Sequence, residues 1–332
     1  MAKRNEFPAP TGDVTAACSV QGPKHHRRDR IGYIKRNYDL YLLLIPALLY
    51  ILIFNYLPMA GITIAFKDYN IFGGANPIDA IWKSDWVGLK HFTKLFSSPD
   101  FARVFRNTLI ISFYRLLFVF PLPILTAIML NEIINVPFKR TIQTIIYLPH
   151  FLSWAVVSGI FLTLLGSTGL VNQFINSLGG ETINFLSSKK WFRSVLIVTD
   201  AWKEVGWGSI IYLAAITAVD PQLYEAATID GAGKIRQLVS VTMPAIAPTI
   251  IMMLILRVGR ILDAGFEQIF VMYHSIVYEV ADIIGTYVYR EGLGRMNFSY
   301  GTAVGLFNSV VALVLVLSSN WLSKRATDKS IW

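Results

Sequence analysis

Several charged side chains lie within two long apolar stretches of the chain, where a charge is costly unless it has a partner or a function. They are Asp200, Lys203, Glu204, Arg257, Arg260, Asp263 and Glu267. Asp200 and Glu204 are four residues apart, and so are Asp263 and Glu267, which places each pair on one helical face. Two interpretations stay open. The groups either form ion pairs that hold a helical bundle together, or they line a polar path through it.

Aromatic residues accompany the first charged group and suggest what such a path would carry. Trp202, Trp207 and Tyr212 can offer flat faces to sugar rings, while the polar groups bond to hydroxyls. The alternative is an aromatic belt at the membrane interface. Two arginines near the middle of their stretch, Arg257 and Arg260, would make a path positive and favour acidic sugars such as uronates.

Two further polar residues lie within apolar stretches. Arg115 is another candidate for the path. His150 follows Pro149, and a histidine beside a helix-kinking proline is more typical of a hydrogen-bond partner for freed carbonyls than of a ligand site.

We find no set of residues for covalent or metal chemistry in the sequence. The five histidines form no metal-ligand spacing within an apolar stretch. Gly233-Lys234 resembles the end of a phosphate-binding loop, but that loop needs a glycine where Thr228 stands and a serine or threonine where Ile235 stands. We therefore expect this chain to bind no cofactor and no metal, and any ATP hydrolysis to come from a partner chain.

Six apolar stretches must position these groups, and each is long enough to cross the hydrocarbon core as a helix of about 20 residues. They cover residues 40–66, 104–130, 141–165, 194–219, 244–270 and 301–322. The chain is 54% hydrophobic and only 15% charged, against about 25% charged in soluble domains, so lipid is the expected solvent. Prolines within the stretches predict kinked or unwound helices around a cavity. The prediction is an all-α polytopic membrane protein with about six transmembrane helices.

Basic residues predict the orientation of these helices. The net charge is +9, and residues 24–36 form a basic run directly before the first stretch, which is typical of a cytoplasmic end. We predict a largely disordered cytoplasmic tail over 1–36, a transmembrane domain over 37–322 and a cytoplasmic tail over 323–332. A nucleic-acid-binding tail is the alternative for the basic run, but nothing downstream resembles a nucleic-acid module.

A polar loop over residues 220–244 separates the fourth and fifth stretches on the predicted cytoplasmic side. Asp220 is a suitable N-cap and Pro221 suits the first helical position. Gly231 and Gly233 allow a tight turn. We expect a second short helix over 234–243, with Pro244 at the start of the fifth span. The loop is therefore predicted to be a helix-turn-helix at the membrane surface.

This loop resembles the signature of the membrane subunits of binding-protein-dependent ABC importers. That signature is Glu-Ala-Ala, three residues, Gly, nine residues and Ile-x-Leu-Pro, with Val241 and Met243 here replacing the Ile and Leu. The resemblance implies that the loop is a cytoplasmic coupling helix that docks into a cleft on an ATP-binding subunit. The residues assigned to coupling are Glu225, Ala226, Ala227, Asp230, Gly231, Ala232, Gly233 and Pro244.

Other segments look like the carbohydrate branch of this family, similar to maltose- and alginate-type importer permeases. They are YLPHFLSWAVVSGIF, WKEVGWGSIIYLAAI, FEQIFVMY and NFSYGTAVGLFNSVVALVLVLSSN. The resemblance implies a permease subunit that carries an oligosaccharide by ATP-driven alternating access across the bacterial cytoplasmic membrane. Its implied partners are a second homologous permease subunit, two ATP-binding subunits that hold ATP and Mg²⁺, an extracytoplasmic solute-binding protein and the lipid bilayer, with no nucleic acid.

Two other functions compete with this interpretation. A secondary transporter or channel without ATP coupling would predict internal repeats and would leave the loop unexplained. A membrane-embedded enzyme would need a nucleophile or a metal cluster, and the sequence offers neither.

Overall fold

The computed structural model describes residues 36–327, and their regular secondary structure is helical apart from one isolated bridge between Lys67 and Trp86. The described residues confirm the predicted all-α class. Most of the predicted N-terminal tail and the last five residues lie outside them. The chain divides into a unit that ends at Met59 and a unit that begins at Ala60, and each is described by itself.

The first unit is a single apolar helix. It comprises α2 (Tyr38–Ile51), the π turn η1 (Leu52–Tyr56) and α3 (Leu57–Met59). No residue of these three segments is buried, although nearly all are apolar. A helix that is apolar all round is typical of a membrane span.

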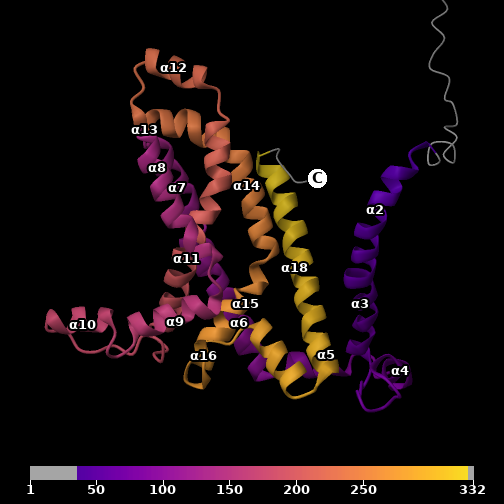
Figure 1. The fold of residues 1–332 in the computed structure, drawn as a ribbon. Helices are drawn as coiled ribbons and strands as arrows, with labels where there is room; N and C mark the ends of the chain where they lie inside the picture. Colours follow the sequence, from indigo (N-terminus) through magenta and orange to yellow (C-terminus); the bar gives the residue numbers. More distant parts are fainter. Residues whose placement is uncertain (1–35, 328–332) are drawn as a thin grey trace, which may run out of the picture. The chain divides into compact units, whose positions relative to one another are not determined.

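The second unit is a bundle of long helices with short helices at both ends (Figure 1). The first half holds η2 (Ala60–Phe66), α4 (Pro77–Lys83), α5 (Lys90–Ser97), α6 (Pro99–Tyr114), η3 (Arg115–Val119), α7 (Pro121–Glu132), α8 (Val136–Tyr147), η4 (Leu148–Phe151), α9 (Trp154–Leu165), α10 (Leu170–Ser177) and α11 (Phe192–Thr217). The second half holds α12 (Pro221–Ile229), α13 (Lys234–Gln237), η5 (Leu238–Thr242), α14 (Met243–Gly259), η6 (Ile261–Asp263), α15 (Phe266–Met272), η7 (Ser275–Val277), α16 (Tyr278–Ala281), α17 (Ile284–Val288), η8 (Tyr289–Gly294) and α18 (Phe298–Thr327).

The centre of the bundle is formed by α7, α11 and α14. α11 packs along α7 and also against α14, and α14 packs against α18. A buried apolar cluster joins the first three helices through Ile124, Ala127, Tyr212, Ile216 and Ile246. Close approach is required at Gly206, where a Cβ atom would overlap the carbonyl of Ile146 in α8. These contacts hold the polar residues of α11 against the helices on either side of it.

Five helical runs of the described residues are long and apolar enough to cross a membrane. They are Tyr38–Phe66, Pro99–Glu132, Trp154–Ser177, Lys234–Gly259 and Phe298–Arg325. α11 corresponds to the predicted fourth span and has 26 residues, but Asp200, Lys203 and Glu204 lower its apolarity. Its crossing of the membrane stays a prediction.

Two of the predicted spans are interrupted. The third breaks at η4, beside Pro149, as the proline content predicts. The prediction that the fifth continues to Phe270 is wrong, because α14 ends at Gly259. Ala264 and Gly265 adopt positive φ angles of 48° and 74°, which an α-helix cannot contain. The break places Arg260 on a turn and Asp263 at the end of the short 3-10 helix η6, both outside α14.

Candidate coupling surface and translocation path

The polar loop forms a helix and a tight turn, as predicted. The side chain of Asp220 accepts a hydrogen bond of 3.0 Å from the backbone N–H of Gln222, and Pro221 opens α12. Gly231 closes the turn at a φ of 75°, and the N–H of Ala232 donates to the carbonyl of Ala227 at 2.8 Å. In Figure 1, α12 stands at one end of the bundle, beyond α13, and α10 and α16 lie toward the other end.

The second half of the loop differs from the prediction. Residues 234–243 do not form a separate short helix, because α13, η5 and α14 form one helical run from Lys234 to Gly259. Pro244 is the second residue of α14, so the span does not begin there. Pro244 cannot donate to the preceding turn. The π turn η5 lies directly before it, and the N–H of Met243 donates to Leu238, five residues back.

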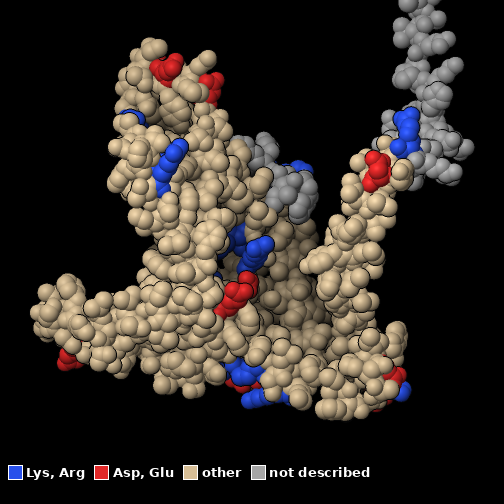
Figure 2. Space-filling view, in the orientation of Figure 1, with Lys and Arg blue, Asp and Glu red and all other residues tan. Residues whose placement is uncertain are grey.

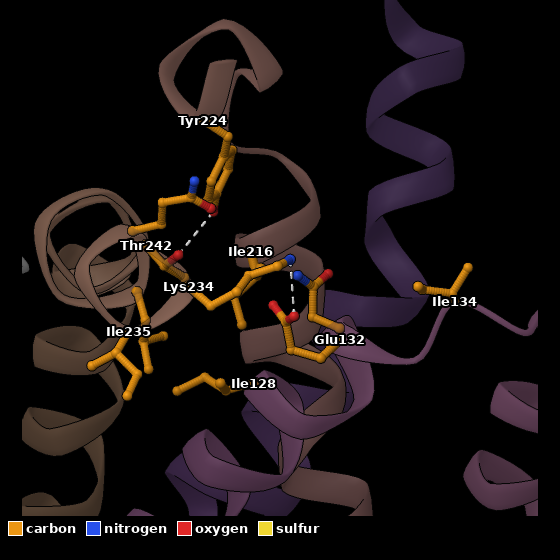
Figure 3. Close-up of a pocket in the computed structure, with 11 residues that line it drawn as sticks. Ile128, Glu132, Ile134, Ile216, Tyr224, Lys234, Ile235 and Thr242 are labelled. Atoms are coloured by element: carbon orange, nitrogen blue, oxygen red, sulfur yellow. Dashed lines mark hydrogen bonds and ion pairs between the residues drawn. The ribbon is translucent and has the colours of Figure 1, made fainter. Parts of the chain in front are cut away.

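Three hydrogen bonds attach α12 and its turn to the following helical run. The hydroxyl groups of Tyr224 and Thr242 are 2.9 Å apart, and the amide of Gln237 donates to Thr228 and to the carbonyl of Ala232. A cavity of about 550 Å³ lies beside the Tyr224–Thr242 bond, and Glu132 and Lys234 pair across 3.1 Å at its edge (Figure 3). α12 is therefore fixed to the start of the run that contains α14.

The outer surface of the loop is open. Six of the residues assigned to coupling are exposed: Glu225, Ala226, Asp230, Gly231, Gly233 and Pro244. Ala227 and Ala232 are half-buried. Two large apolar side chains that the motif does not include, Ile229 and Ile235, are 87% and 80% exposed. Apolar residues in a polar loop are the signal that could have identified them.

A buried polar network lies between α11 and the segments η3 and α15. The guanidinium of Arg115 donates to the side-chain oxygen of Gln268, whose amide donates to Thr199 at 2.5 Å and to the carbonyl of Leu196 at 2.8 Å. One oxygen of Asp200 lies 3.6 Å from Arg115 and 3.7 Å from Arg257. Sequence reasoning missed Gln268, because an uncharged amide in an apolar segment carries no strong signal.

A second polar network joins the break at η4 to α11. His150 lies 2.9 Å from a carboxylate oxygen of Glu204 and stacks on the indole of Trp207, with ring centroids 4.6 Å apart. Lys203 donates to the backbone carbonyl of His150 at 2.6 Å and lies 3.5 Å from Glu204. The backbone carbonyl at the helix break is thus bonded by Lys203 and not by the imidazole of His150. The imidazole bonds to the carboxylate of Glu204 instead.

Two cavities lie beside these networks. The arginine cavity, of about 130 Å³, is lined by Arg115, Arg257, Arg260 and Asp263 among others. The aromatic cavity, of about 200 Å³, is lined by Phe120, Glu204, Trp207, Tyr212 and Arg257 among others. Figure 2 shows basic and acidic side chains side by side at mid-height of the bundle.

Neither cavity is lined by Asp200, Trp202, Lys203 or Glu267. Trp202 is 42% exposed and packs against Phe161 of α9. Glu267 lies on α15 with an exposed side chain. The structure therefore brings together Glu204, Trp207, Tyr212, Arg257, Arg260 and Asp263, with Lys203 behind Glu204.

Ion pairs at the end of the bundle opposite α12 connect short segments. Lys90 bonds to Asp68, and this hydrogen bond holds the pKa of the Asp68 carboxyl below its ordinary value. Lys189 pairs with Glu279 and likewise lowers the pKa of that carboxyl. All four side chains lie outside the five helical runs that are long enough to cross a membrane.

Comparison with known proteins gives the same family throughout. The family described as binding-protein-dependent transport system inner membrane component matches residues 119–328. Protein LplB of Bacillus subtilis (strain 168) is 49% identical over 300 residues, which cover 90% of this chain and 92% of LplB. The polygalacturonan/rhamnogalacturonan transport system permease protein YteP of the same organism is 47% identical over 312 residues, or 93% of this chain and 95% of YteP.

Solved structures agree with these relatives. A bacterial ABC transporter involved in the import of the acidic polysaccharide alginate contains a chain with a TM-score of 0.83 and 43% identity, covering 90% of this chain and 99% of that chain. A bacterial alginate ABC transporter in complex with an alginate pentasaccharide-bound periplasmic protein gives 0.82, with the same identity and coverage.

The family decides between the functions that the sequence leaves open. A permease of this kind is a multi-pass component of the inner membrane and is not itself catalytic, since ATP is bound by a partner ATPase. The secondary transporter and the membrane-embedded enzyme are therefore set aside. The exposed helical loop, the interrupted spans and the matched sequence all lead to one conclusion: the chain belongs to the family of binding-protein-dependent transport system inner membrane components, as the permease of an ABC importer.

Proposed function

We propose that this chain forms the membrane path of an ABC importer for acidic oligosaccharides, such as those built from uronates. The observation that carries the substrate class is the group of arginines beside the aromatic cavity. Arg257 and Arg260 face the arginine cavity, while Trp207 and Tyr212 line the neighbouring one. The similarity to YteP, a polygalacturonan/rhamnogalacturonan permease, and to an importer of the acidic polysaccharide alginate supports an acidic carbohydrate.

The coupling surface is the exposed face of α12 with its turn. Glu225 has no ion-pair partner among the described residues and is free to pair with a basic side chain of an ATP-binding subunit. Small residues beside it allow close approach of that subunit. Closure of two ATP-binding subunits would then move α12 as a rigid body and alternate the access of the path.

The assembly in which this chain works is proposed from the family to which it belongs. Its partners are a second homologous permease subunit, two ATP-binding subunits and an extracytoplasmic solute-binding protein. Both termini of the chain lie in the bacterial cytoplasm, on the side of α12. The similar alginate transporter forms a complex with a periplasmic protein, which supports the proposed solute-binding partner.

Uptake in proteoliposomes tests the proposal. The complete importer is reconstituted and given labelled galacturonate or alginate oligosaccharides, with maltotriose as the neutral control. We expect ATP-dependent uptake of the acidic saccharides and little uptake of maltotriose. Preference for maltotriose would contradict the acidic substrate class.

A single charge reversal tests the coupling surface in the same assay. Glu225→Arg should abolish both uptake and substrate-stimulated ATP hydrolysis, while the variant still inserts into the membrane and assembles. Unchanged uptake in this variant would contradict the assignment of α12 to coupling.

A further inference from the structure

Arg257 lines both the arginine cavity and the aromatic cavity. We propose that the aromatic cavity is a subsite for a single uronate ring, whose carboxylate binds Arg257 and whose face stacks on Trp207. This subsite rests on the proposed function, because it assumes that acidic saccharides pass through this chain.

The guanidinium of Arg257 has N–H groups that are available to bind a ligand. Its contact with Asp200 is 3.7 Å, which is longer than a hydrogen bond. The same oxygen of Asp200 is also shared with Arg115 at 3.6 Å and has no hydrogen-bond partner among the described residues. The side chain of Arg257 is 42% exposed, so its remaining N–H groups can reach a ligand.

The charges around Arg257 leave room for one more anion. Four positive groups, those of Arg115, Arg257, Arg260 and Lys203, lie around the two cavities. They face three carboxylates, those of Asp200, Asp263 and Glu204. A ligand carboxylate would balance the remaining positive charge, and a guanidinium can bind it through two parallel hydrogen bonds. A neutral sugar ring would leave this charge without a counterion.

The walls of the aromatic cavity fit a sugar ring. His150 covers one face of the Trp207 indole, yet Trp207 lines the cavity and is 44% exposed. Glu204 lines the same cavity, is held by His150 and Lys203, and can accept hydrogen bonds from ring hydroxyls. The volume of about 200 Å³ is below the roughly 300–1,000 Å³ of pockets for drug-sized ligands, so the cavity suits one ring of a longer chain.

Variants of Arg257 in the complete reconstituted importer test the subsite, with a galacturonate trisaccharide as the probe. Arg257→Gln should reduce uptake at subsaturating saccharide by about tenfold or more, because a hydrogen bond to a charged group is lost. Arg257→Lys, which keeps the charge, should retain more uptake than Arg257→Gln. Arg140→Gln removes an exposed guanidinium of α8 that lines neither cavity, and should leave uptake unchanged.

A double variant separates substrate binding from a structural ion pair. If Arg257 served only to neutralise Asp200, the combination of Asp200→Asn with Arg257→Gln would restore uptake, because the unpaired charge is removed. Asp200→Asn alone is the reference, because this change also removes the contact between Asp200 and Arg115. The subsite requires that the double variant stay as impaired in uptake as Arg257→Gln, that Asp200→Asn alone retain more uptake, and that all three variants assemble with the ATP-binding subunits.

A third change tests the stacking surface. Trp207→Ala should lower uptake of the trisaccharide, and Trp207→Phe should retain most of it, because a flat ring remains. The subsite is wrong if Arg257→Gln behaves like Arg140→Gln, if the double variant recovers, or if Trp207→Ala transports normally. Failure of the wild-type importer to take up the trisaccharide would contradict the proposed function instead.

Discussion

Single glycines hold the two functional regions in unusual backbone conformations. Gly265 has a φ of 74°, and a Cβ atom there would overlap the guanidinium of Arg115. Gly231 has a φ of 75°, but a Cβ atom there would meet nothing within 4 Å. The first glycine is therefore required by both conformation and packing, and the second by conformation alone.

Gly265→Ala should destabilise the importer more than a glycine change that causes only strain. The left-handed conformation costs an alanine about 1–2 kcal/mol, and displacement of Arg115 from its bond to Gln268 adds to this cost. Gly88→Ala is the matched control, since Gly88 has a φ of 60° and open space around it. Thermal unfolding of the solubilised complex measures both. Equal losses would contradict the packing role of Gly265.

Gly231→Val should impair coupling through backbone strain, because a β-branched residue is strongly disfavoured at positive φ. Gly231→Asn should retain coupling, because asparagine tolerates the left-handed region and the space around it is open. Substrate-stimulated ATP hydrolysis and uptake check this difference. Equal activity of the two variants would show that the turn conformation is not needed.

At the scale of elements, one helical run joins the coupling loop to the candidate subsite. α13, η5 and α14 extend from Lys234 to Gly259, and Arg257 lies in the last turn. α12 is attached to this run by the bond between Tyr224 and Thr242. A displacement of α12 would thus act directly on the π turn η5, which contains Thr242. The helical run would transmit it to the far end of α14, where Arg257 lies.

Tyr224→Phe removes the hydroxyl of that bond and keeps the ring. We expect a few-fold fall in saccharide imported per ATP hydrolysed, because a net hydrogen bond contributes about 0.5–1.5 kcal/mol. Ser240→Ala is the control, since Ser240 only bonds within its own helical run, to the carbonyl of Arg236. An import ratio equal to that of Ser240→Ala would mean that this bond does not transmit the movement of α12.

At the scale of the whole chain, local sequence rules predicted the helices better than their interruptions. The apolar stretches and the Asp220–Pro221 helix start could be read directly, because lipid and capping impose simple patterns. The break after Gly259 could not, because Ala264, which adopts the left-handed conformation, belongs to a buried cluster with Ile111 and Leu196, which are distant in sequence. Gln268 was missed for the same reason, since its partners Thr199 and Arg115 are about 70 and 150 residues away.

The orientation of the chain is the prediction that concerns all of its spans together. In Figure 1, α12 and α10 lie toward opposite ends of the bundle, so the predicted orientation puts α12 in the cytoplasm and α10 outside. The chain has a single cysteine, Cys18, which lies outside the described residues and reports the side of the N-terminus. Cys18→Ser gives a chain without cysteine. A single cysteine is then introduced into it at an exposed position, by Ile229→Cys in α12 or by Ser177→Cys in α10.

Labelling with a membrane-impermeant maleimide should divide these three thiols into two groups. In right-side-out vesicles, only the cysteine at position 177 should react. In inside-out vesicles, Cys18 and the cysteine at position 229 should react, and that at position 177 should not. Detergent-solubilised protein, in which all three should react, controls for buried thiols. The labelling pattern also shows which part of the predicted topology is wrong. If Cys18 and the cysteine at position 229 react from opposite sides, the number of spans before α12 differs from the predicted four. If all three thiols react from the side opposite to the predicted one, the whole chain has the opposite orientation, and the coupling surface faces away from the cytoplasmic ATP.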